Sequence, residues 1–254
     1  MALSLGVLSH AVAETLRISL PAMRKSRRGT LTRQECDASL VSWANKILIR
    51  ARVELHVEGQ ENLNPLLAPQ AADASTDFLS AIIVSNHLSL YDIPVIYSAL
   101  PLSLRMAAKK SIFKIPIWGS ALRAAGFVSI DRKSPEKARA NLQLAGATIR
   151  DRQISLYIAP EGTRSKTGKI QRFKRGAFEL ALATGLPVLP IALQGTEGVH
   201  KKGALKIHFD QTVSLKILPL ISAQGFKDSR AMADHVQNAI SLARSSSEEK
   251  GLTK

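Results

Sequence analysis

Short apolar runs alternate with helical patterns through most of this 254-residue chain, and that alternation limits the possible folds more than any other feature. Helices between consecutive strands lead to parallel strand pairing and cover the faces of the sheet. We therefore predict an α/β fold, a single layered domain with a mostly parallel central sheet flanked by helices. The predicted strands are residues 53–58, 78–84, 105–108, 126–130, 154–158, 188–193 and 205–209, and the predicted helices are residues 116–125, 134–151, 174–184 and 229–244.

The first 52 residues precede the first predicted strand and indicate a helical appendage. An amphipathic helix with a basic end can lie in a membrane interface, whereas packing of its apolar stripe on the protein's own domain is the commoner arrangement. The charge balance and the substrate class discussed below favour the interface. A basic run follows at residues 24–28, and the stripe consists of Leu5, Leu8, Val12 and Leu16.

A second helix is predicted at residues 32–52, from apolar residues at helical spacing. This divides the chain into a membrane-associating segment at 1–52, the main domain at 53–246 and a polar tail at 247–254. No stretch reads as a spanning helix, since the longest uncharged one, 180–196, contains two glycines and two prolines. We expect a peripheral or monotopic protein at the cytoplasmic face of a membrane.

The charge balance predicts an anionic partner, because 35 Lys and Arg residues face 20 Asp and Glu residues, a net charge of +15. Nucleic acid, phosphorylated metabolites and anionic membrane lipids all fit that charge. Cys36 is the only cysteine, so the chain has no internal disulfide. The sequence shows no metal-ligand spacing, and we expect no metal and no cofactor.

One candidate for chemistry follows the apolar run that ends at Val84. The carboxyl ends of strands in open α/β sheets are where sites form. His87 could act there as a general base, and Asp92 could orient its imidazole, provided that the chain turns at the start of a helix. An ordinary capped turn is the other interpretation of these two residues.

Two more predicted strands end in residues suited to anion binding. After residue 158, Gly162 allows close backbone approach, Thr163 adds a hydroxyl and Arg164 offers a planar fork for a phosphate. A surface turn with a solvated arginine is the alternative there. After residue 130, Asp131 and Arg132 could bind a ligand or simply pair with each other. One site formed by three strand ends is the economical explanation.

With these residues in view, the chain resembles the glycerolipid acyltransferase family, whose best-known members are the bacterial 1-acyl-glycerol-3-phosphate acyltransferases. The likeness covers about residues 53–212 and includes a Lys109-Lys110 pair and a Phe-Lys-Arg-Gly-Ala segment at 173–177. Ala159 stands where the family commonly has an aromatic residue. The four family blocks appear in order as Asn-His-x-x-x-x-Asp at 86–92, a block ending Ile-Asp-Arg at 126–132, Pro-Glu-Gly-Thr-Arg-Ser at 160–165 and Leu-Pro-Val-x-Pro at 186–190.

The resemblance implies an O-acyltransferase. His87, oriented by Asp92, would take the proton from an acceptor hydroxyl, which attacks an acyl thioester without an acyl-enzyme. The acceptor would be a lysophospholipid such as 1-acyl-glycerol 3-phosphate, giving phosphatidic acid, and the donor would be acyl-CoA or an acyl-carrier protein. The resemblance assigns acceptor binding to Glu161, Gly162, Thr163, Arg164, Arg132 and Lys110.

Other functions are weighed against this one. Another lysolipid, such as a lyso-ornithine lipid or lysophosphatidylethanolamine, could be the acceptor. A lipid-surface binding protein with a degenerate site conflicts with the intact His87 and Asp92. A nucleic-acid binder fits the charge, but the chain has only 5% aromatic residues and no recognisable nucleic-acid module, so we expect no nucleic-acid partner.

Overall fold

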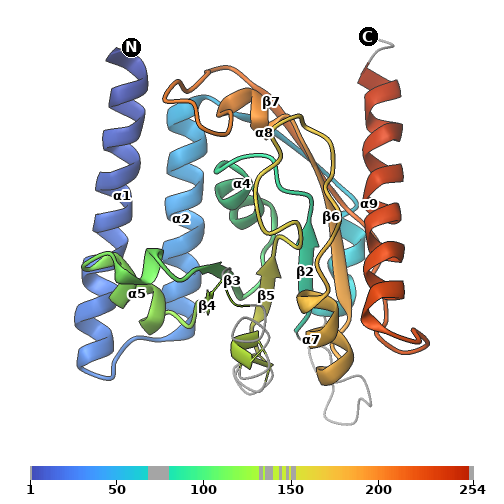
Figure 1. Ribbon diagram of the computed structural model, residues 1–254. Helices are drawn as coiled ribbons and strands as arrows, with labels where there is room; N and C mark the ends of the chain where they lie inside the picture. The colour runs from blue at the N-terminus through green and yellow to red at the C-terminus, as the bar shows by residue number, and fades with distance from the viewer. Residues whose placement is uncertain are drawn as a thin grey trace.

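The computed structural model describes residues 2–67, 80–131, 134, 140–142, 145–146, 149 and 153–251 (Figure 1). In this part of the chain, one seven-stranded sheet has the order β1-β7-β6-β2-β5-β3-β4. All neighbouring strands run parallel except β6 and β7, which are antiparallel. The predicted α/β fold with a mostly parallel sheet is therefore confirmed. The strands are β1 (Glu54–Glu58), β2 (Ile82–Ser85), β3 (Leu104–Lys109), β4 (Val128–Ile130), β5 (Ser155–Ile158), β6 (Val188–Gln194) and β7 (Thr212–Ile217).

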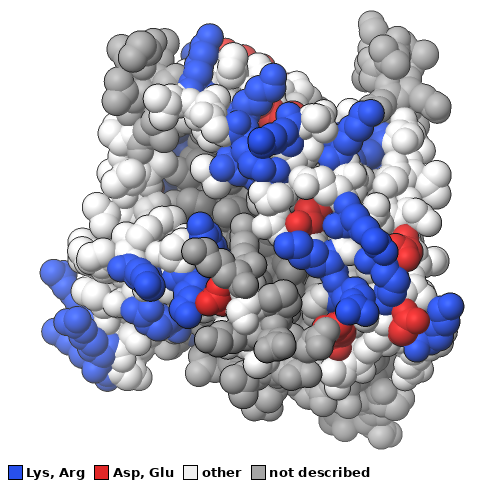
Figure 2. Space-filling view, viewed as in Figure 1, with Lys and Arg blue, Asp and Glu red and all other residues white. Residues whose placement is uncertain are grey.

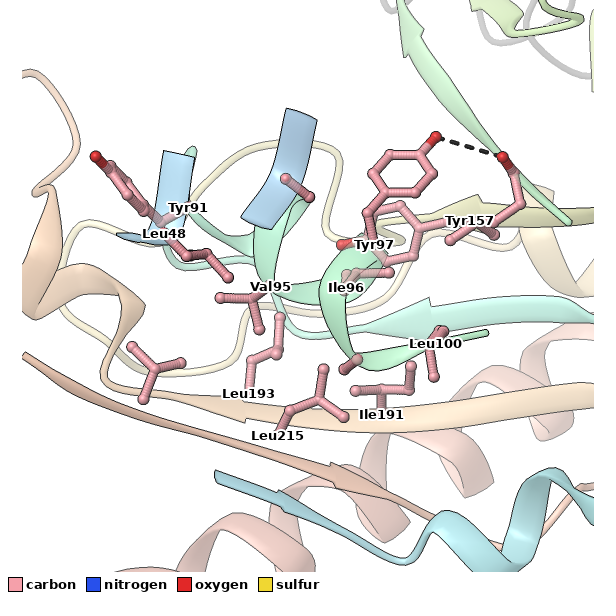
Figure 3. Close-up of a cluster of buried hydrophobic side chains, with 14 of the residues drawn as sticks. Leu48, Tyr91, Val95, Ile96, Tyr97, Leu100, Tyr157, Ile191, Leu193 and Leu215 are labelled. Carbon is pink, nitrogen blue, oxygen red and sulfur yellow. Dashed lines mark hydrogen bonds between the residues drawn. The ribbon is translucent and has the colours of Figure 1, made fainter. Parts of the chain in front are cut away.

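Helices cover both faces of the sheet because the central strands are buried on both sides. In β2, Ile83 packs with the helices α2 and α4, whereas its neighbours Ile82 and Val84 pack with α7 and α9. Figure 3 shows the first of these two cores, around Val95 and Ile96 of α4. The helices are α1 (Ala2–Arg27), α2 (Arg33–Ala51), α3 (Asn64–Leu67), α4 (Asp92–Ala99), α5 (Trp118–Ala124), α7 (Gly176–Thr184), α8 (Thr196–Val199) and α9 (Ser229–Gly251), with short 3₁₀ turns at Gln60–Leu63 and Ile112–Lys114.

The second predicted helix, α2, begins at a capping box formed by Thr32 and Glu35. Thr32 caps α2: its hydroxyl accepts the N–H of Glu35 at 3.2 Å, and the Glu35 carboxylate accepts the N–H of Thr32. Ala44, Ile47 and Leu48 on α2 are buried in the same core as α4. Residues on the two sides of the predicted boundary at residue 52 therefore pack in one core.

Helix α1 packs on the domain, but not through Val12 and Leu16 of the predicted stripe. Val7 is buried in the core, and the indole N–H of Trp43 on α2 donates to the Thr15 hydroxyl at 3.1 Å. Val12 and Leu16 remain 60% and 38% exposed; the side chains of Leu5 and Leu8 are outside the described part. Among the described residues, no helix is both long and apolar enough to cross a membrane.

Several predicted boundaries move in the structure. The strand predicted at 205–209 is wrong: that segment is a loop, in which Leu205 is 83% exposed. Asp210, at φ 56°, turns the chain, and the strand forms at β7, where alternate residues Val213, Leu215 and Ile217 are buried. The final helix continues past residue 244 to Gly251. Of the helix predicted at 134–151, residues 140–142, 145–146 and 149 are helical, and most others lie outside the described residues, as do 78 and 79 of the second predicted strand.

Gly195, which joins β6 to α8, provides a test of this packing. It has φ 89°, and a Cβ there would lie 2.5 Å from the carbonyl oxygen of Thr212. Gly203 has a similar φ of 85° but open space around it. We expect Gly203→Ala to lower the free energy of unfolding by about 1–2 kcal/mol, from backbone strain alone. Gly195→Ala should cost about 1–3 kcal/mol more, because the backbone must also shift.

Urea unfolding followed by circular dichroism measures both variants against the parent protein. Equal losses in the two variants would contradict the close approach of Gly195 to β7.

Candidate active site

The candidate residues gather at one edge of the sheet because β2, β3, β4 and β5 are mutually parallel and end on the same side. His87 follows β2, Lys110 follows β3, Asp131 follows β4 and the 161–164 loop follows β5. Arg132 lies outside the described residues. The strands β2, β3, β4 and β5 therefore end at one edge of the sheet, as the sequence predicted for three of these strand ends.

His87 and Asp92 are paired directly. Nδ1 of His87 lies 2.7 Å from Oδ2 of Asp92, and the imidazole is 13% exposed. They are five positions apart in the sequence, and the loop turns back at the start of α4, where Asp92 is the first residue. With Nδ1–H donated to the carboxylate, the neutral ring leaves the Nε2 lone pair available to accept a proton.

Four further contacts hold the carboxylate of Asp92, which is completely buried. The backbone N–H of Leu88 donates to Oδ2 at 2.8 Å, and the N–H of Ser89 lies 3.1 Å from both oxygens. The hydroxyl of Thr196, the first residue of α8, donates to Oδ1 at 2.5 Å. A buried carboxylate with this many donors has one orientation, and it fixes the imidazole in turn.

Glu161 connects the loops after β2 and β5. Its Oε1 accepts the backbone N–H of His87 at 2.8 Å, and its Oε2 accepts the N–H of Gln171 at 3.1 Å. A return bond runs from the N–H of Ser165 to the carbonyl of His87 at 2.8 Å. Burial raises the pKa of the Glu161 carboxyl above its usual range. Because each carboxylate oxygen accepts a backbone N–H, Glu161 holds the backbone at His87 and Gln171 in place.

Residues 162–164, which follow Glu161, line a cavity together with the cationic side chains of Lys174 and Lys202. Gly162 has φ 73°, and a Cβ there would lie 2.8 Å from Nζ of Lys174. Nη1 of Arg164 is buried and has no hydrogen-bond partner in the described part of the chain. Nζ of Lys202 donates to the Thr163 hydroxyl at 3.0 Å and to the Arg164 carbonyl at 2.6 Å.

That cavity, of about 1300 Å³, has a cationic part and an apolar part. His87 lines it together with Gly162, Thr163 and Arg164. On the face shown in Figure 2, Lys and Arg side chains gather on both sides of the middle of the molecule. An amphiphile with an anionic headgroup fits this lining. The apolar wall comes from α1, α2, α4, β3 and α5, through Ile18, Leu40, Trp43, Ile93, Met106 and Leu122.

Lys110 is placed differently from the rest. Its ammonium lies 3.2 Å from Oδ2 of Asp131 and is 55% exposed, so an ion pair partly neutralises its charge. Among the described residues, no three His, Cys, Asp or Glu side chains gather so as to hold a metal ion.

Sequence reasoning missed Thr196 and Lys202. Thr196 follows the predicted strand at 188–193, so the strand-end rule that found His87 could also have found Thr196. No sequence signal pointed to Lys202. It lies in the loop after α8, and the sequence predicted that this loop leads into a strand at 205–209, which does not form.

The family model described as Acyltransferase matches residues 54–194. A 1-acyl-sn-glycerol-3-phosphate acyltransferase from Cocos nucifera is 33% identical over 172 residues, which are 66% of this chain and 55% of the relative. The chloroplastic 1-acyl-sn-glycerol-3-phosphate acyltransferase LPAT1 of Arabidopsis thaliana is 36% identical over 162 residues, 64% of this chain and 42% of the relative. The chain spans about half the length of these curated relatives.

Among solved structures, the 1-acyl-sn-glycerophosphate acyltransferase PlsC from Thermotoga maritima aligns with a TM-score of 0.79. The alignment has 24% sequence identity and covers 97% of this chain and 95% of that chain. This likeness confirms the fold, including the presence of the N-terminal helices.

The raised pKa of Glu161 predicts a pH dependence of stability. Below its ordinary value of 4.5 the carboxyl is protonated in both states, and above that value the unfolded chain loses its proton first. The free energy of unfolding of the parent, relative to that of Glu161→Gln, should therefore fall as pH rises through the window above 4.5. The fall is about 1.4 kcal/mol for each unit by which the folded pKa exceeds the unfolded one.

Urea unfolding from about pH 4 to about pH 8 measures this difference. Glu61→Gln, at an exposed position, is the control and should show a much smaller trend. A parent-to-variant difference that stays constant with pH would rule out the raised pKa.

Proposed function

This chain belongs to the acyltransferase family whose model matches residues 54–194, and on that premise we propose that it acylates a lysophospholipid. The reaction is transfer of a fatty acyl group from a thioester to the sn-2 hydroxyl of 1-acyl-glycerol 3-phosphate, giving phosphatidic acid for phospholipid biosynthesis. The observation that carries the proposal is the His87–Asp92 pair, 2.7 Å apart, on a cavity that is apolar in one part and cationic in another. The names of the relatives support the same acceptor.

In the proposed mechanism, Nε2 of His87 removes the proton of the acceptor hydroxyl as its oxygen attacks the thioester carbonyl. The buried Asp92 stabilises the imidazolium that forms. The tetrahedral intermediate then collapses, the carbon–sulfur bond breaks, and the leaving thiolate takes the proton from His87. Ester and free thiol are the products, and no covalent enzyme intermediate is required.

The acceptor phosphate is assigned to the cationic part of the cavity. Arg164 presents a buried guanidinium nitrogen without a partner in the described residues, which suits an anion. Gly162 and Thr163 line the cavity beside it. Glu161 braces this loop through backbone contacts, and the proposal keeps Lys110 and Arg132 as further sources of positive charge.

The apolar part of the cavity is assigned to the acyl chains. Its wall includes Trp43 and Leu40 of α2 and Met106 of β3. Burial of a chain there releases about 0.8 kcal/mol for each methylene group. Acyl-CoA and acyl-carrier protein both remain possible donors, since each presents the same thioester.

We place the protein peripherally on the cytoplasmic face of a membrane. Val12 and Leu16 of α1 are exposed although apolar, and the last turn of the same helix carries Arg24, Lys25 and Arg27. This combination suits adsorption to anionic lipids without spanning the bilayer. Adsorption also brings the lysolipid acceptor to the enzyme.

His87→Ala tests the reaction. Loss of a general base should lower the rate of acyl transfer to 1-acyl-glycerol 3-phosphate by at least about 10²-fold. His208→Ala, on an exposed side chain, is the control and should keep the parent rate. The measurement is transfer from a radiolabelled thioester, as acyl-CoA or acyl-carrier protein, to a panel of lysolipids.

Transfer to a different lysolipid alone would replace the acceptor and keep the mechanism. A His87→Ala variant as active as the parent would contradict the assigned base.

The double substitution Val12→Glu and Leu16→Glu tests membrane adsorption. Both side chains are exposed, so folding should be unaffected, while the two carboxylates oppose insertion next to anionic lipid. Sedimentation with vesicles containing phosphatidylglycerol should fall about tenfold. Leu242→Glu on α9, where the leucine is 70% exposed, is the matched control. Unchanged sedimentation of the double variant would exclude α1 as the membrane contact.

A further inference from the structure

Lys202 lies beside the 162–164 loop although it is outside the family match, which ends at residue 194. It lines the same cavity as His87 and Arg164. Its ammonium donates to the Thr163 hydroxyl at 3.0 Å and to the Arg164 carbonyl at 2.6 Å. Both acceptors are uncharged oxygens, so neither of them neutralises the positive charge. An ammonium has three N–H donors, which leaves one for a ligand.

The position of Lys202 depends on the contacts that hold the His87–Asp92 pair. Thr196 at the start of α8 binds Asp92, and the Ser89 hydroxyl donates to the carbonyl of His200 at 2.8 Å. Nε2 of His200 lies 2.9 Å from the carbonyl of Ala204, which closes the turn containing Lys202. Helix α8 is therefore fastened to Asp92 at its start, and the residue that follows it is fastened to the His87 loop, two positions before Lys202.

Several cationic side chains lie near the 162–164 loop. Among the described residues, a buried guanidinium nitrogen of Arg164 has no hydrogen-bond partner, and the Lys174 ammonium lies next to Gly162. The nearby Glu161 carboxylate accepts backbone N–H groups. Burial lowers the pKa of His200, which keeps that imidazole neutral near neutral pH. Lys202 is thus the cation that the loop after α8 adds.

A phosphomonoester carries close to two negative charges at neutral pH, because its second pKa is about 6. A phosphodiester headgroup carries one. We propose that Lys202 is a specificity-determining residue that supplies, with Arg164, the second positive charge required by a phosphomonoester dianion, so that the site favours monoester lysolipids over diester ones. This inference rests on the proposed function for the class of acceptor.

Binding tests the inference without turnover. Isothermal titration calorimetry compares short-chain 1-acyl-glycerol 3-phosphate with the matching lysophosphatidylglycerol, a diester. The parent should bind the monoester more tightly. Lys202→Gln should weaken monoester binding about tenfold and diester binding less than about threefold, since one charge-assisted contact is lost. Lys202→Arg should keep most of the preference, because it keeps the charge.

Lys201→Gln is the matched control, since Lys201 is exposed on the same loop. It should bind both ligands as the parent does. If Lys202→Gln weakened binding of the monoester and the diester equally, Lys202 would only hold the loop. The same conclusion would follow if Lys202→Arg lost as much of the monoester preference as Lys202→Gln. A parent with no preference for the monoester would also overturn the proposal.

Acyl transfer by the parent, measured alongside, separates the two proposals. Selective binding that depends on Lys202, without any transfer, would refute the proposed function and leave the binding role of Lys202 standing. Transfer to the monoester with unchanged ligand preference in Lys202→Gln would refute the role of Lys202 and leave the function standing.

Discussion

The buried carboxylate of Asp92 is the point on which the site depends. It receives the imidazole N–H of His87, the backbone N–H groups of Leu88 and Ser89, and the hydroxyl of Thr196. An ionised carboxylate without such partners would be costly to bury. These donors join the loop after β2, the first turn of α4 and the first residue of α8. One side chain therefore sets the direction of the base and the relative positions of three segments.

Glu161, in the loop after β5, likewise holds two segments together through its carboxylate. Its two oxygens accept the backbone N–H groups of His87 and Gln171, so one side chain braces both the loop of the proposed base and the 162–164 loop proposed to bind the anion. The free energy of burying this second carboxyl is reflected in its raised pKa. A residue in a sequence block can thus support a candidate site through backbone contacts.

The two parts of the cavity follow from the layers of the fold. Strand ends supply loops that bring cations to the cavity, whereas α1, α2 and α5 add an apolar wall beyond the sheet. Helix α1 buries Val7 against the domain and leaves Val12 and Leu16 exposed. A cavity with a cationic and an apolar part and an exposed apolar patch on α1 therefore occur in the same molecule, which suits the proposed chemistry at a lipid interface.

Local patterns in the sequence determined most elements and the place of the site. Alternating and helical spacing predicted most strands, the cap at Thr32 lies at the predicted start of α2, and the strand-end rule brought His87, Asp92 and residues 161–164 together. The elements depend on residues a few positions apart, and the meeting of the strand ends follows from the parallel order that alternating strands and helices predict. Tertiary structure decided the shift of the last strand from 205–209 to β7, the inward turn of Glu161 and the exposure of Val12 and Leu16 on α1. It also placed Thr196 on Asp92 and Lys202 on Thr163, because contacts between residues 104 and 39 positions apart exist only once β6 and β7 have taken their places in the sheet.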